Sequence, residues 1–243
     1  VNFAHRTFEW SSEAKGKAAV HCVIIGFSLT NRTNKTLFEY ETIRSEPHAV
    51  KASRINPYLV DADDVVLTNR RRAICNVPQL SFGSMPNDGG HLMLEEEEAK
   101  AFLAEDPAAQ KFVRPILGSV EYINAIPRFC LWLKGAAPSE LRASAAIMQR
   151  VAKVRAKRAE STRPATNSLA ETPTLFGEDR QPTKKYLAIP KTSSEGRRYI
   201  PMGFLEPTIV ANTELFTSED AGLYHFGVLT STMLMAWIRA VCG

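Results

Sequence analysis

Basic side chains gather in three parts of this 243-residue chain, and their chemistry suits contacts with nucleic acid. Lysine and arginine neutralise phosphates, arginine pairs bidentately with guanine, and glutamate can accept a hydrogen bond from cytosine N4. Clusters of these residue types therefore favour a DNA-binding surface. The residues that we single out as candidate DNA contacts are Arg70, Arg71, Arg72, Arg150, Lys153, Lys157, Ser193, Ser194, Glu195, Arg197 and Arg198.

The first cluster follows residues 64–68 (DVVLT), which have the pattern of a short strand or the start of a helix. If a strand continues through the cluster, Arg70 and Arg72 share one face and Arg71 points to the other. The third cluster, at 193–199, has the composition of a turn that carries hydroxyl groups, one acid and two guanidinium groups. Surface ion pairs are the alternative interpretation of the arginines at 70–72.

The second cluster belongs to a predicted long helix that starts at Pro138 and Ser139, with Ser139 as N-cap, and runs to about residue 161. Its apolar face is predicted from Ile147, Val151 and Val154, at i, i+4 and i+7. Over residues 142–163 seven basic residues face a single acid, Glu160. The stripe Arg150, Lys153 and Lys157 and a second stripe, Arg155 and Arg158, therefore predict a helix that neutralises phosphates. A merely solvated basic face is the alternative.

No recognisable catalytic signature accompanies these clusters. The glycine-rich turn that would bring a backbone close to S-adenosylmethionine (SAM) is absent, because Gly16 and Gly26 stand alone. Asn56-Pro57-Tyr58 lacks the second proline of the tetrapeptide that binds a flipped adenine, so a turn anchored by a buried tyrosine is the preferred interpretation. Phosphate-loop and hydrolase patterns are also missing. We therefore expect a chain without catalytic residues.

Residues 79–90 hold many glycine, proline, serine, asparagine and aspartate residues, which predicts a loop of consecutive turns. His91 follows this loop, close to Asp88. We expect the loop either to be organised by its own side chains or to face another domain. Its candidate residues are Asn87, Asp88, Gly89 and Gly90.

Composition limits the other possibilities. The net charge of +4 permits a polyanionic partner without requiring one. Four cysteines stand far apart without a CxxC pair, and the histidines are scattered, so reduced thiols, a cytoplasmic location and no metal site are expected. No run reaches the ~20 apolar residues of a membrane helix.

The order of predicted elements indicates an α+β fold with mainly antiparallel sheets, a long basic helix and a C-terminal apolar helix. Residues 18–29 predict a buried strand and 36–42 its hairpin partner, and 121–123 predict a further strand. Residues 223–241 predict one apolar helix. The chain begins without methionine and stops directly after this apolar pattern, so we expect both ends to be cut from something longer.

Several long strings carry a family resemblance. They are FEWSSEAKGKAAVHCVIIGF (8–27), INPYLVDA (55–62), VPQLSFGSMPNDGGHL (77–92), VRPILGSVEYI (113–123), RFCLWL (128–133), LFGEDRQP (175–182), SSEGRRYIPMGFL (193–205) and FGVLTSTMLMAWIRAVCG (226–243). With these strings the chain resembles, along nearly its whole length, the target-recognition region of the MmeI-like family. These are bacterial single-chain restriction–modification enzymes, also called Type IIL.

The resemblance implies a division of labour. In this family a SAM-binding adenine-N6 methyltransferase domain lies N-terminal to the target-recognition region, and some members carry an endonuclease domain further upstream. The chain is then expected to bind double-stranded DNA for that methyltransferase domain, with SAM held there and no cofactor of its own. The implied domains are a junction at 1–17, a DNA target-recognition domain at 18–222 and a truncated helical segment at 223–243. Charged residues that specify bases in the family include a cluster just after the string ending at Cys242-Gly243.

Two other functions remain open from the residues alone. One is a non-catalytic module that docks another protein through the apolar ends of the chain. The other is an unrecognised hydrolase that uses His91 and Asp88, which would require a cleft that joins them to a nucleophile.

Overall fold

The computed structural model describes residues 1–11, 19–66, 68, 70, 72–194 and 196–241. The chain forms two compact units. Unit 1 comprises residues 1–75 and 233–243, and unit 2 comprises residues 76–232. The sequence analysis expected domain boundaries at 17/18 and 222/223. These boundaries refer to the domains of the longer MmeI-like proteins, and they stay a prediction.

Unit 1 is built on a four-stranded sheet in the order β2-β1-β3-β4. Its strands are β1 (Phe3–Ser11), β2 (Ala19–Gly26), β3 (Lys35–Glu39) and β4 (His48–Ala52). β1 pairs antiparallel with β2 through a bulge between His5 and Phe8, and it pairs parallel with β3 on its other side. β3 and β4 are antiparallel. β2 and β4 are therefore the edges of this sheet.

A small apolar core lies on the sheet of unit 1. Ala4 of β1, Leu37 of β3 and Ala52 of β4 are buried together with Ile55, and Leu59 packs against them. Helix α7 (Thr232–Val241), of which residues 233–241 belong to this unit, adds Trp237, whose ring lies 5.7 Å from that of Tyr58.

Two expectations for this unit were wrong. β2 was predicted to be buried, yet most of its side chains are exposed because it is an edge strand. Residues 36–42 were predicted to form its hairpin partner, but β3 pairs with β1 and β4 instead. A local sequence pattern cannot show that β1 lies between β2 and β3, because the pairing partner of a strand is determined by the whole sheet.

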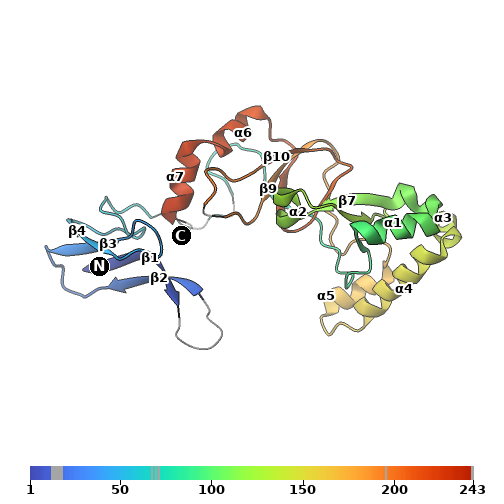
Figure 1. Ribbon diagram of the computed structural model, residues 1–243, viewed down its shortest axis with the longest axis horizontal. Helices are drawn as coiled ribbons and strands as arrows, with labels where there is room; N and C mark the ends of the chain where they lie inside the picture. Colours follow the sequence, from blue (N-terminus) through green and yellow to red (C-terminus); the bar gives the residue numbers. More distant parts are fainter. Residues whose placement is uncertain (12–18, 67, 69, 71, 195, 242–243) are drawn as a thin grey trace. The chain divides into compact units, whose positions relative to one another are not determined.

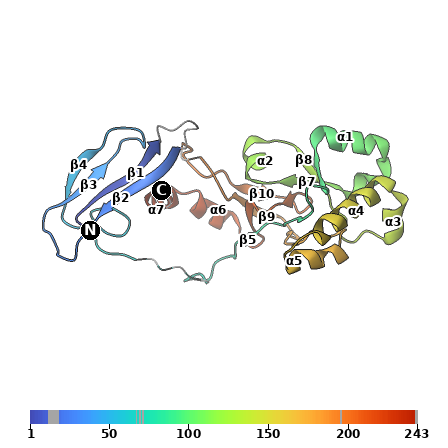
Figure 2. The same cartoon turned by 90° about the horizontal axis from the view of Figure 1, so that it is seen from below.

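Unit 2 contains two four-stranded sheets, in the orders β10-β9-β12-β5 and β11-β7-β8-β6 (Figures 1 and 2). The strands are β5 (Ser81–Phe82), β6 (Met93–Glu95), β7 (Val113–Leu117), β8 (Arg128–Leu131), β9 (Tyr186–Pro190), β10 (Gly203–Leu205), β11 (Val210–Ala211) and β12 (Leu215–Ser218). Among the described strand pairs of unit 2, only β11 and β7 are parallel.

Unit 2 also contains α-helices and short 3-10 helices. They are α1 (Glu96–Glu105), η1 (Pro107–Phe112), α2 (Ser119–Asn124), α3 (Pro138–Ala143), α4 (Ala145–Ala159), α5 (Pro164–Asn167), η2 (Ser168–Glu171) and α6 (Leu223–Leu229). The main core lies where α1, α3 and α4 pack on β6, β7 and β8. Fully buried members include Leu94, Leu131, Ile147 and Val154. Among the described residues no helix has the length and apolar character needed to span a membrane.

The predicted long basic helix is divided in two. α3 ends at Ala143, and Ser144 has extended backbone geometry and caps α4, because its Oγ accepts a hydrogen bond from the Ile147 amide at 3.1 Å. Ser139 is not the N-cap: that position is Ala137, whose amide donates to the Glu140 carboxylate at 2.9 Å. The apolar face was predicted correctly, since Ile147, Val151 and Val154 are all buried.

Two further elements differ from expectation. The predicted strand at 121–123 is helix α2, because Gly118 is its N-cap and donates its amide to the Glu121 carboxylate at 2.9 Å. The apolar helix predicted at 223–241 is two helices, α6 and α7, separated at Thr230. The fold class itself is confirmed: helices combine with mainly antiparallel sheets, and the C-terminal apolar region is helical, although it forms two helices.

The Ser144 cap predicts a measurable asymmetry between two serines of this region. Ser144→Ala removes the side-chain acceptor of the Ile147 amide and should lower the free energy of unfolding by about 1 kcal/mol. Ser139→Ala, at an exposed site in α3, should change it by less than ~0.5 kcal/mol. Urea unfolding followed by circular dichroism measures both. An equal loss from the two variants would contradict a helix boundary at Ser144.

Candidate nucleic-acid interface

Helix α4 presents the most basic exposed surface that the structure describes on a single helix. Its buried face points into the main core through Ile147, Val151 and Val154, which fixes the opposite face toward solvent. Lys153 and Lys157 lie on the exposed side. These two ammonium groups are therefore available to a negatively charged partner.

Their local electrostatics differ slightly. The Lys157 ammonium lies 3.7 Å from the Glu160 carboxylate, and both side chains are largely exposed. Such a surface pair contributes little and exchanges readily for another anion. Lys153 has no ion pair with any residue in the described part of the chain. A phosphate could contact both without breaking a buried interaction.

Arg150, in contrast, is engaged by the protein. Its guanidinium donates to the His91 carbonyl at 2.9 Å, forms an ion pair with Glu98 and lies 5.6 Å from the centre of the Phe102 ring. These contacts join α4 to α1 and to the start of β6. Arg150 was predicted as a phosphate contact together with Lys153 and Lys157, and that role stays a prediction. The structure gives Arg150 a packing role that the two lysines lack.

Arg158 departs furthest from the sequence-based expectation. It was placed on a second solvent-exposed basic stripe beside Arg155, yet it is only 1% exposed. All five N–H groups of a guanidinium can donate, and here each directs a hydrogen bond to a backbone carbonyl. The acceptors are the carbonyls of Asn87 (2.8 Å), Pro86 (2.8 Å), Leu169 (3.0 Å), Thr172 (2.9 Å) and Leu175 (2.7 Å).

The sequence held a signal for this burial that the stripe analysis missed. Arg158 follows Val154 by four positions and Val151 by seven, so it continues the apolar face and not the basic one. Burial lowers the pKa of the Arg158 guanidinium from its ordinary value, and the nearby Asp88 carboxylate opposes that shift. The backbone carbonyls around it supply the hydrogen-bond acceptors that water would otherwise provide.

The loop ahead of His91 lies against α4. Asn87 and Gly89 have φ angles of 47° and 67°, in the left-handed region. The side chain of Lys157 passes so close to Gly89 that a Cβ there would lie 2.8 Å from Lys157 Cγ. Only glycine satisfies both demands. The loop and the Lys157 side chain thus form one continuous surface.

Asp88 organises this loop from inside. It is buried, and its two carboxylate oxygens accept hydrogen bonds from the amides of Gly90 (3.0 Å) and Leu92 (2.6 Å). Among the described residues no hydrogen bond joins the Asp88 carboxylate to the His91 ring, and both carboxylate oxygens bind loop amides instead. The His91–Asp88 pairing of the alternative hydrolase hypothesis is therefore not seen in this part of the chain.

The turn at 193–198 is the second candidate surface in unit 2. The Ser194 carbonyl accepts from the Arg197 amide at 3.1 Å, and the Ser194 hydroxyl accepts from the Gly196 amide at 3.3 Å. Arg198 is exposed and lies 5.3 Å from the centre of the Tyr199 ring. Ser193 is exposed as well, and Glu195 lies outside the described residues. Arg197 is only partly exposed, so among the described residues of this turn Ser193, Ser194 and Arg198 are the most accessible.

The two candidate surfaces of unit 2 lie apart. The connection between β9 and β10, which carries this turn, extends from its sheet away from the end of the unit where α4 and α5 lie (Figures 1 and 2). A single contact point for both clusters is therefore not present within unit 2. An extended ligand is needed to reach both.

The first basic cluster belongs to unit 1. Arg70 and Arg72 are exposed, and Arg71 lies outside the described residues. The strand that was predicted to run from 64–68 into this cluster is wrong, because no described residue between 64 and 80 has strand geometry. The alternation of faces inferred for these arginines therefore does not apply. Their exposure is that of side chains on an extended surface segment.

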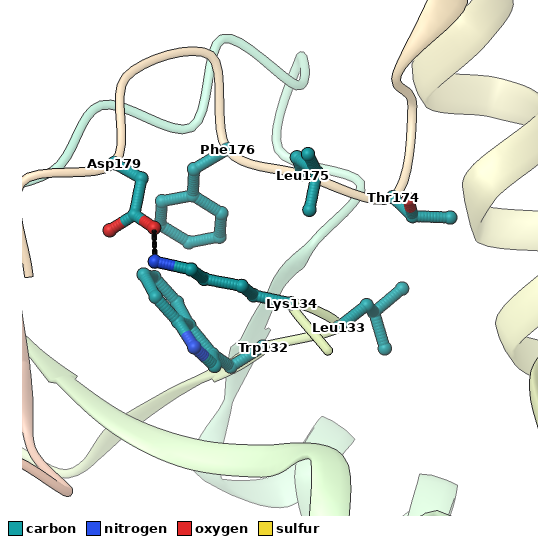
Figure 3. Close-up of a pocket in the computed structure, with 7 residues that line it drawn as sticks. All are labelled: Trp132, Leu133, Lys134, Thr174, Leu175, Phe176 and Asp179. Carbon is teal, nitrogen blue, oxygen red and sulfur yellow. Dashed lines mark ion pairs between the residues drawn. The ribbon is translucent and has the colours of Figure 1, made fainter. Parts of the chain in front are cut away.

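Neither cavity resembles a cofactor site. The cavity in Figure 3 has a volume of about 80 Å³ and lies beside the rings of Trp132 and Phe176, where Lys134 extends toward Asp179 to form an ion pair. A cavity in unit 1 near Arg6, Tyr58 and Arg239 measures about 210 Å³. Ligand pockets usually exceed roughly 300 Å³. Within the described residues no cluster of histidine, cysteine and carboxylate side chains could hold a metal.

The Asn56-Pro57-Tyr58 segment is a structural turn. Asn56 is buried, and its side-chain oxygen accepts hydrogen bonds from the amides of Tyr58 (2.9 Å) and Val60 (3.3 Å). The turn is thus anchored by the asparagine, and not by a buried tyrosine as the sequence analysis expected. Because the side-chain oxygen of Asn56 already accepts these two hydrogen bonds, it is not presented to a base.

Comparison with known families places the chain. Residues 61–243 match the model described as the target recognition domain of MmeI, and residues 1–39 match the MmeI DNA-methyltransferase domain. The chain belongs to the MmeI family. The methyltransferase match covers β1, β2 and β3, and the target-recognition match covers all of unit 2.

Two relatives of the family give the scale of the similarity. DNA methyltransferase A of Bacillus subtilis (strain 168) is 36% identical over 244 residues, which cover 100% of this chain and 27% of that protein. The solved structure of the Type IIL restriction–modification enzyme MmeI in complex with DNA matches with a TM-score of 0.92 and 43% identity, over 99% of this chain and 32% of that one. The chain therefore spans about a third or less of these relatives.

Arg158 and Arg155 form a matched pair for testing this geometry. Arg158→Met leaves buried carbonyls without donors and should lower the free energy of unfolding by ~3–5 kcal/mol. Arg155→Met, on the exposed side of the same helix, should change it by less than ~0.5 kcal/mol. Chemical denaturation monitored by tryptophan fluorescence distinguishes them. Similar losses in the two variants would contradict the buried assignment of Arg158.

Proposed function

We propose that this chain recognises duplex DNA on behalf of a SAM-dependent, site-specific DNA methyltransferase and does not itself transfer the methyl group. The observation that carries the proposal is the target-recognition match over residues 61–243, which includes the exposed basic face of α4. The solved structure of the relative MmeI is a complex with DNA.

The mechanism divides positioning from sequence reading. Lys153 and Lys157 neutralise backbone phosphates and fix the register of the duplex without selecting bases. Arg197 and Arg198, on a tight exposed turn, are placed to reach base edges, where arginine pairs with guanine O6 and N7. Because the turn and α4 lie apart within unit 2, a rod-like duplex suits them better than a small anion. Arg70 and Arg72 in unit 1 supply further phosphate contacts.

The loop at 87–90 has a different part in this proposal. Asn87, Asp88, Gly89 and Gly90 hold a rigid turn next to Lys157, and Gly90 is exposed. The turn sets the position of the Lys157 stem and offers a surface to the methyltransferase domain. Arg150 acts mainly by holding α4 to α1, so its substitution should affect stability as well as DNA binding.

The chemistry belongs to the methyltransferase domain. There SAM is bound, the target base is flipped out of the duplex, and its amino group is methylated; we expect adenine N6 as the acceptor. A fused endonuclease is a further expectation from the family resemblance. Adenine-N6 methylation and a fused endonuclease are more specific expectations than the relationship to DNA methyltransferases. Methylation and cleavage assays of the full gene product on DNA of known sequence test them.

Phosphate binding by α4 predicts a defined loss of affinity. Lys153→Ala/Lys157→Ala should weaken binding to all duplexes alike, because phosphate contacts carry no sequence information. It should also reduce the slope of log K against log salt by about 0.9 for each phosphate released. Lys100→Ala, which removes an exposed ammonium on α1, serves as the matched control and should leave both quantities unchanged. Fluorescence anisotropy with labelled duplexes measures them.

An unchanged salt slope in the double variant would remove α4 from the interface. Absence of any salt-dependent duplex binding by the chain would contradict the proposed function as a whole. Neither lysine is buried, so the double variant should unfold like the unaltered chain. Unfolding curves of the same variants check that a change in DNA affinity is not caused by a loss of stability.

Base reading by the turn predicts a different pattern. Arg198→Ala should weaken binding to the preferred duplex by a factor equivalent to ~1–3 kcal/mol and should have a smaller effect on unrelated duplexes. Selection of bound sequences from a random duplex pool, with the unaltered chain and with this variant, measures the change. Equal losses on all sequences would reassign Arg198 to phosphate contact.

The division of labour predicts no methyl transfer by the chain itself. Incubation with tritiated SAM and duplex DNA should leave the DNA unlabelled, whereas the full gene product should label it. Labelled DNA from the chain alone would contradict its assignment as a recognition module.

A further inference from the structure

A long irregular segment joins β4 to β5. No helix or strand is described between Ala52, where β4 ends, and Ser81, where β5 begins. Connections of this length without secondary structure are uncommon in compact domains, and they usually serve a function or act as linkers. The part that belongs to unit 1 and carries the first basic cluster is what we call the arginine arm. Its described residues are all exposed: 62–66, 68, 70 and 72–75.

The start of the arginine arm is fixed to the body of unit 1 by two aspartates. The Asp61 carboxylate accepts hydrogen bonds from the amides of Ser53 (3.2 Å) and Arg54 (2.9 Å). The Asp63 carboxylate accepts from the Arg54 guanidinium at 3.2 Å, and the Asp63 carbonyl accepts from the Asn56 side-chain amide at 3.3 Å. These contacts determine where the arm leaves the unit, and they occupy both of these carboxylates.

The two described arginines of the arm are not engaged by the protein. Arg70 and Arg72 have no hydrogen bond or ion pair with any residue in the part of the chain that the structure describes. By contrast, Arg6, Arg44 and Arg54 of the same unit each form an ion pair with a carboxylate. The arm therefore carries two guanidinium groups without an internal partner on a segment that is fixed at its start.

The shape of the arm determines which groove of a duplex it can enter. The major groove, about 12 Å wide, suits a helix or a two-stranded ribbon, whereas the minor groove is about 6 Å wide and receives single extended arms. Arginines enter the minor groove because its electrostatic potential is strongly negative, most of all where A·T pairs make it narrow. Val65, Val66 and Ile74, which are 53%, 65% and 77% exposed, are apolar side chains of the kind that minor-groove proteins place against base steps.

We propose that the arginine arm lies in the minor groove of the bound duplex, with Arg70 and Arg72 directed toward base edges between the two rows of phosphates. The guanidinium N–H groups donate to adenine N3 and thymine O2, which are the acceptors exposed there. The N2 amino group of guanine projects into the same groove and opposes a donor, so the arm favours A·T pairs. Two residues of extended chain span about 6–7 Å, on the order of two base steps, so both side chains reach neighbouring pairs.

This inference rests on the proposed recognition of duplex DNA. It refines the phosphate contacts of Arg70 and Arg72 into a position within one groove, and it adds a preference for base composition. The preference is chemically independent of base reading by Arg198, because guanine O6 and N7 lie in the major groove. Each of the two contributions can therefore be removed without the other.

Inosine separates the two grooves in a binding experiment. An inosine·cytosine pair keeps the major-groove groups of G·C but lacks the guanine N2 amino group, so its minor groove offers the acceptors of an A·T pair. Unlabelled poly(dI-dC) and poly(dG-dC) compete with a labelled duplex for the 243-residue chain, and fluorescence anisotropy measures the competition. We expect poly(dI-dC) to compete at least about fivefold more strongly. Equal competition by the two polymers overturns the proposal.

Two double variants assign the preference to the arm. Arg70→Ala/Arg72→Ala should bind both polymers alike, because the groups that sense the N2 amino group are gone. Lys153→Ala/Lys157→Ala removes the same number of charges from α4 and should weaken both polymers while keeping their ratio, since phosphate contacts carry no sequence information. A preference that survives in the arginine variant, or that disappears in the lysine variant, overturns the proposal.

A ligand that fills the minor groove supplies a second readout. Netropsin, which occupies the minor groove of A·T pairs, should weaken the binding of the unaltered chain to poly(dA-dT) more than that of Arg70→Ala/Arg72→Ala. The variant has already lost the contacts that netropsin displaces. Equal weakening of the two proteins overturns the proposal.

Failure of this inference can be distinguished from failure of the proposed function. A chain that binds both polymers with a salt-dependent affinity, but does not distinguish them, refutes only the minor-groove position of the arm. A chain that binds neither polymer contradicts the recognition of duplex DNA and the arm together. Urea unfolding checks that the arginine variant is folded, which we expect because both side chains are exposed.

Discussion

The guanidinium of Arg158 is the interaction on which the arrangement of the candidate interface depends. It donates to five carbonyls, two before the turn at Asn87 and Asp88 and three in the segment that follows α5. A loop buried in this way would otherwise leave carbonyl groups without donors, at a cost of about 1–3 kcal/mol each. One side chain of α4 thus fixes two irregular segments against the helix. The solvent-exposed face of α4 is rigid because the opposite face of the helix holds these two segments through Arg158.

The basic residues of α4 divide by this geometry into two groups. Arg150 and Arg158 point toward the protein, where they bind carbonyls, a carboxylate or an aromatic ring. Lys153, Arg155 and Lys157 remain on the solvent side. Arginine suits the first task, since its planar fork can serve several acceptors at once, and lysine suits the second as a mobile point charge. Counting positive charges along the helix does not separate these roles, whereas position relative to the apolar face does.

The same distinction explains how far the sequence predicted the structure. The apolar face of α4, the mixed fold and the existence of strand β2 follow from local periodicity, and the structure agrees. The break at Ser144 and the helix α2 did not follow, because each depends on one hydrogen bond between a side chain and a backbone amide. Neither the alternative strand nor the continuous helix violates any local preference. In both cases a hydrogen bond between a side chain and a backbone amide determines the structure.

The candidate site was predictable in composition but not in geometry. Sequence identified the clusters at 150–157 and 193–198 and the turn-forming residues 87–90. It did not show that Arg150 is engaged by Glu98, that Asp88 serves the loop backbone, or that the two clusters of unit 2 lie apart. The apolar run of β2 is the instructive case. Its pattern was that of a covered strand, yet within the described residues it lies at the edge of its sheet with most of its side chains exposed.

The central claim is that the solvent face of α4 lies against duplex DNA, and lysine footprinting tests it most directly. The chain is acetylated briefly with and without saturating duplex, and each lysine is quantified by mass spectrometry. The account predicts that Lys153 and Lys157 lose reactivity when the duplex is present, while Lys100 on α1 and Lys184, which pairs with Asp220, do not. Equal reactivity of Lys153 and Lys157 in the free and DNA-bound chain would contradict it.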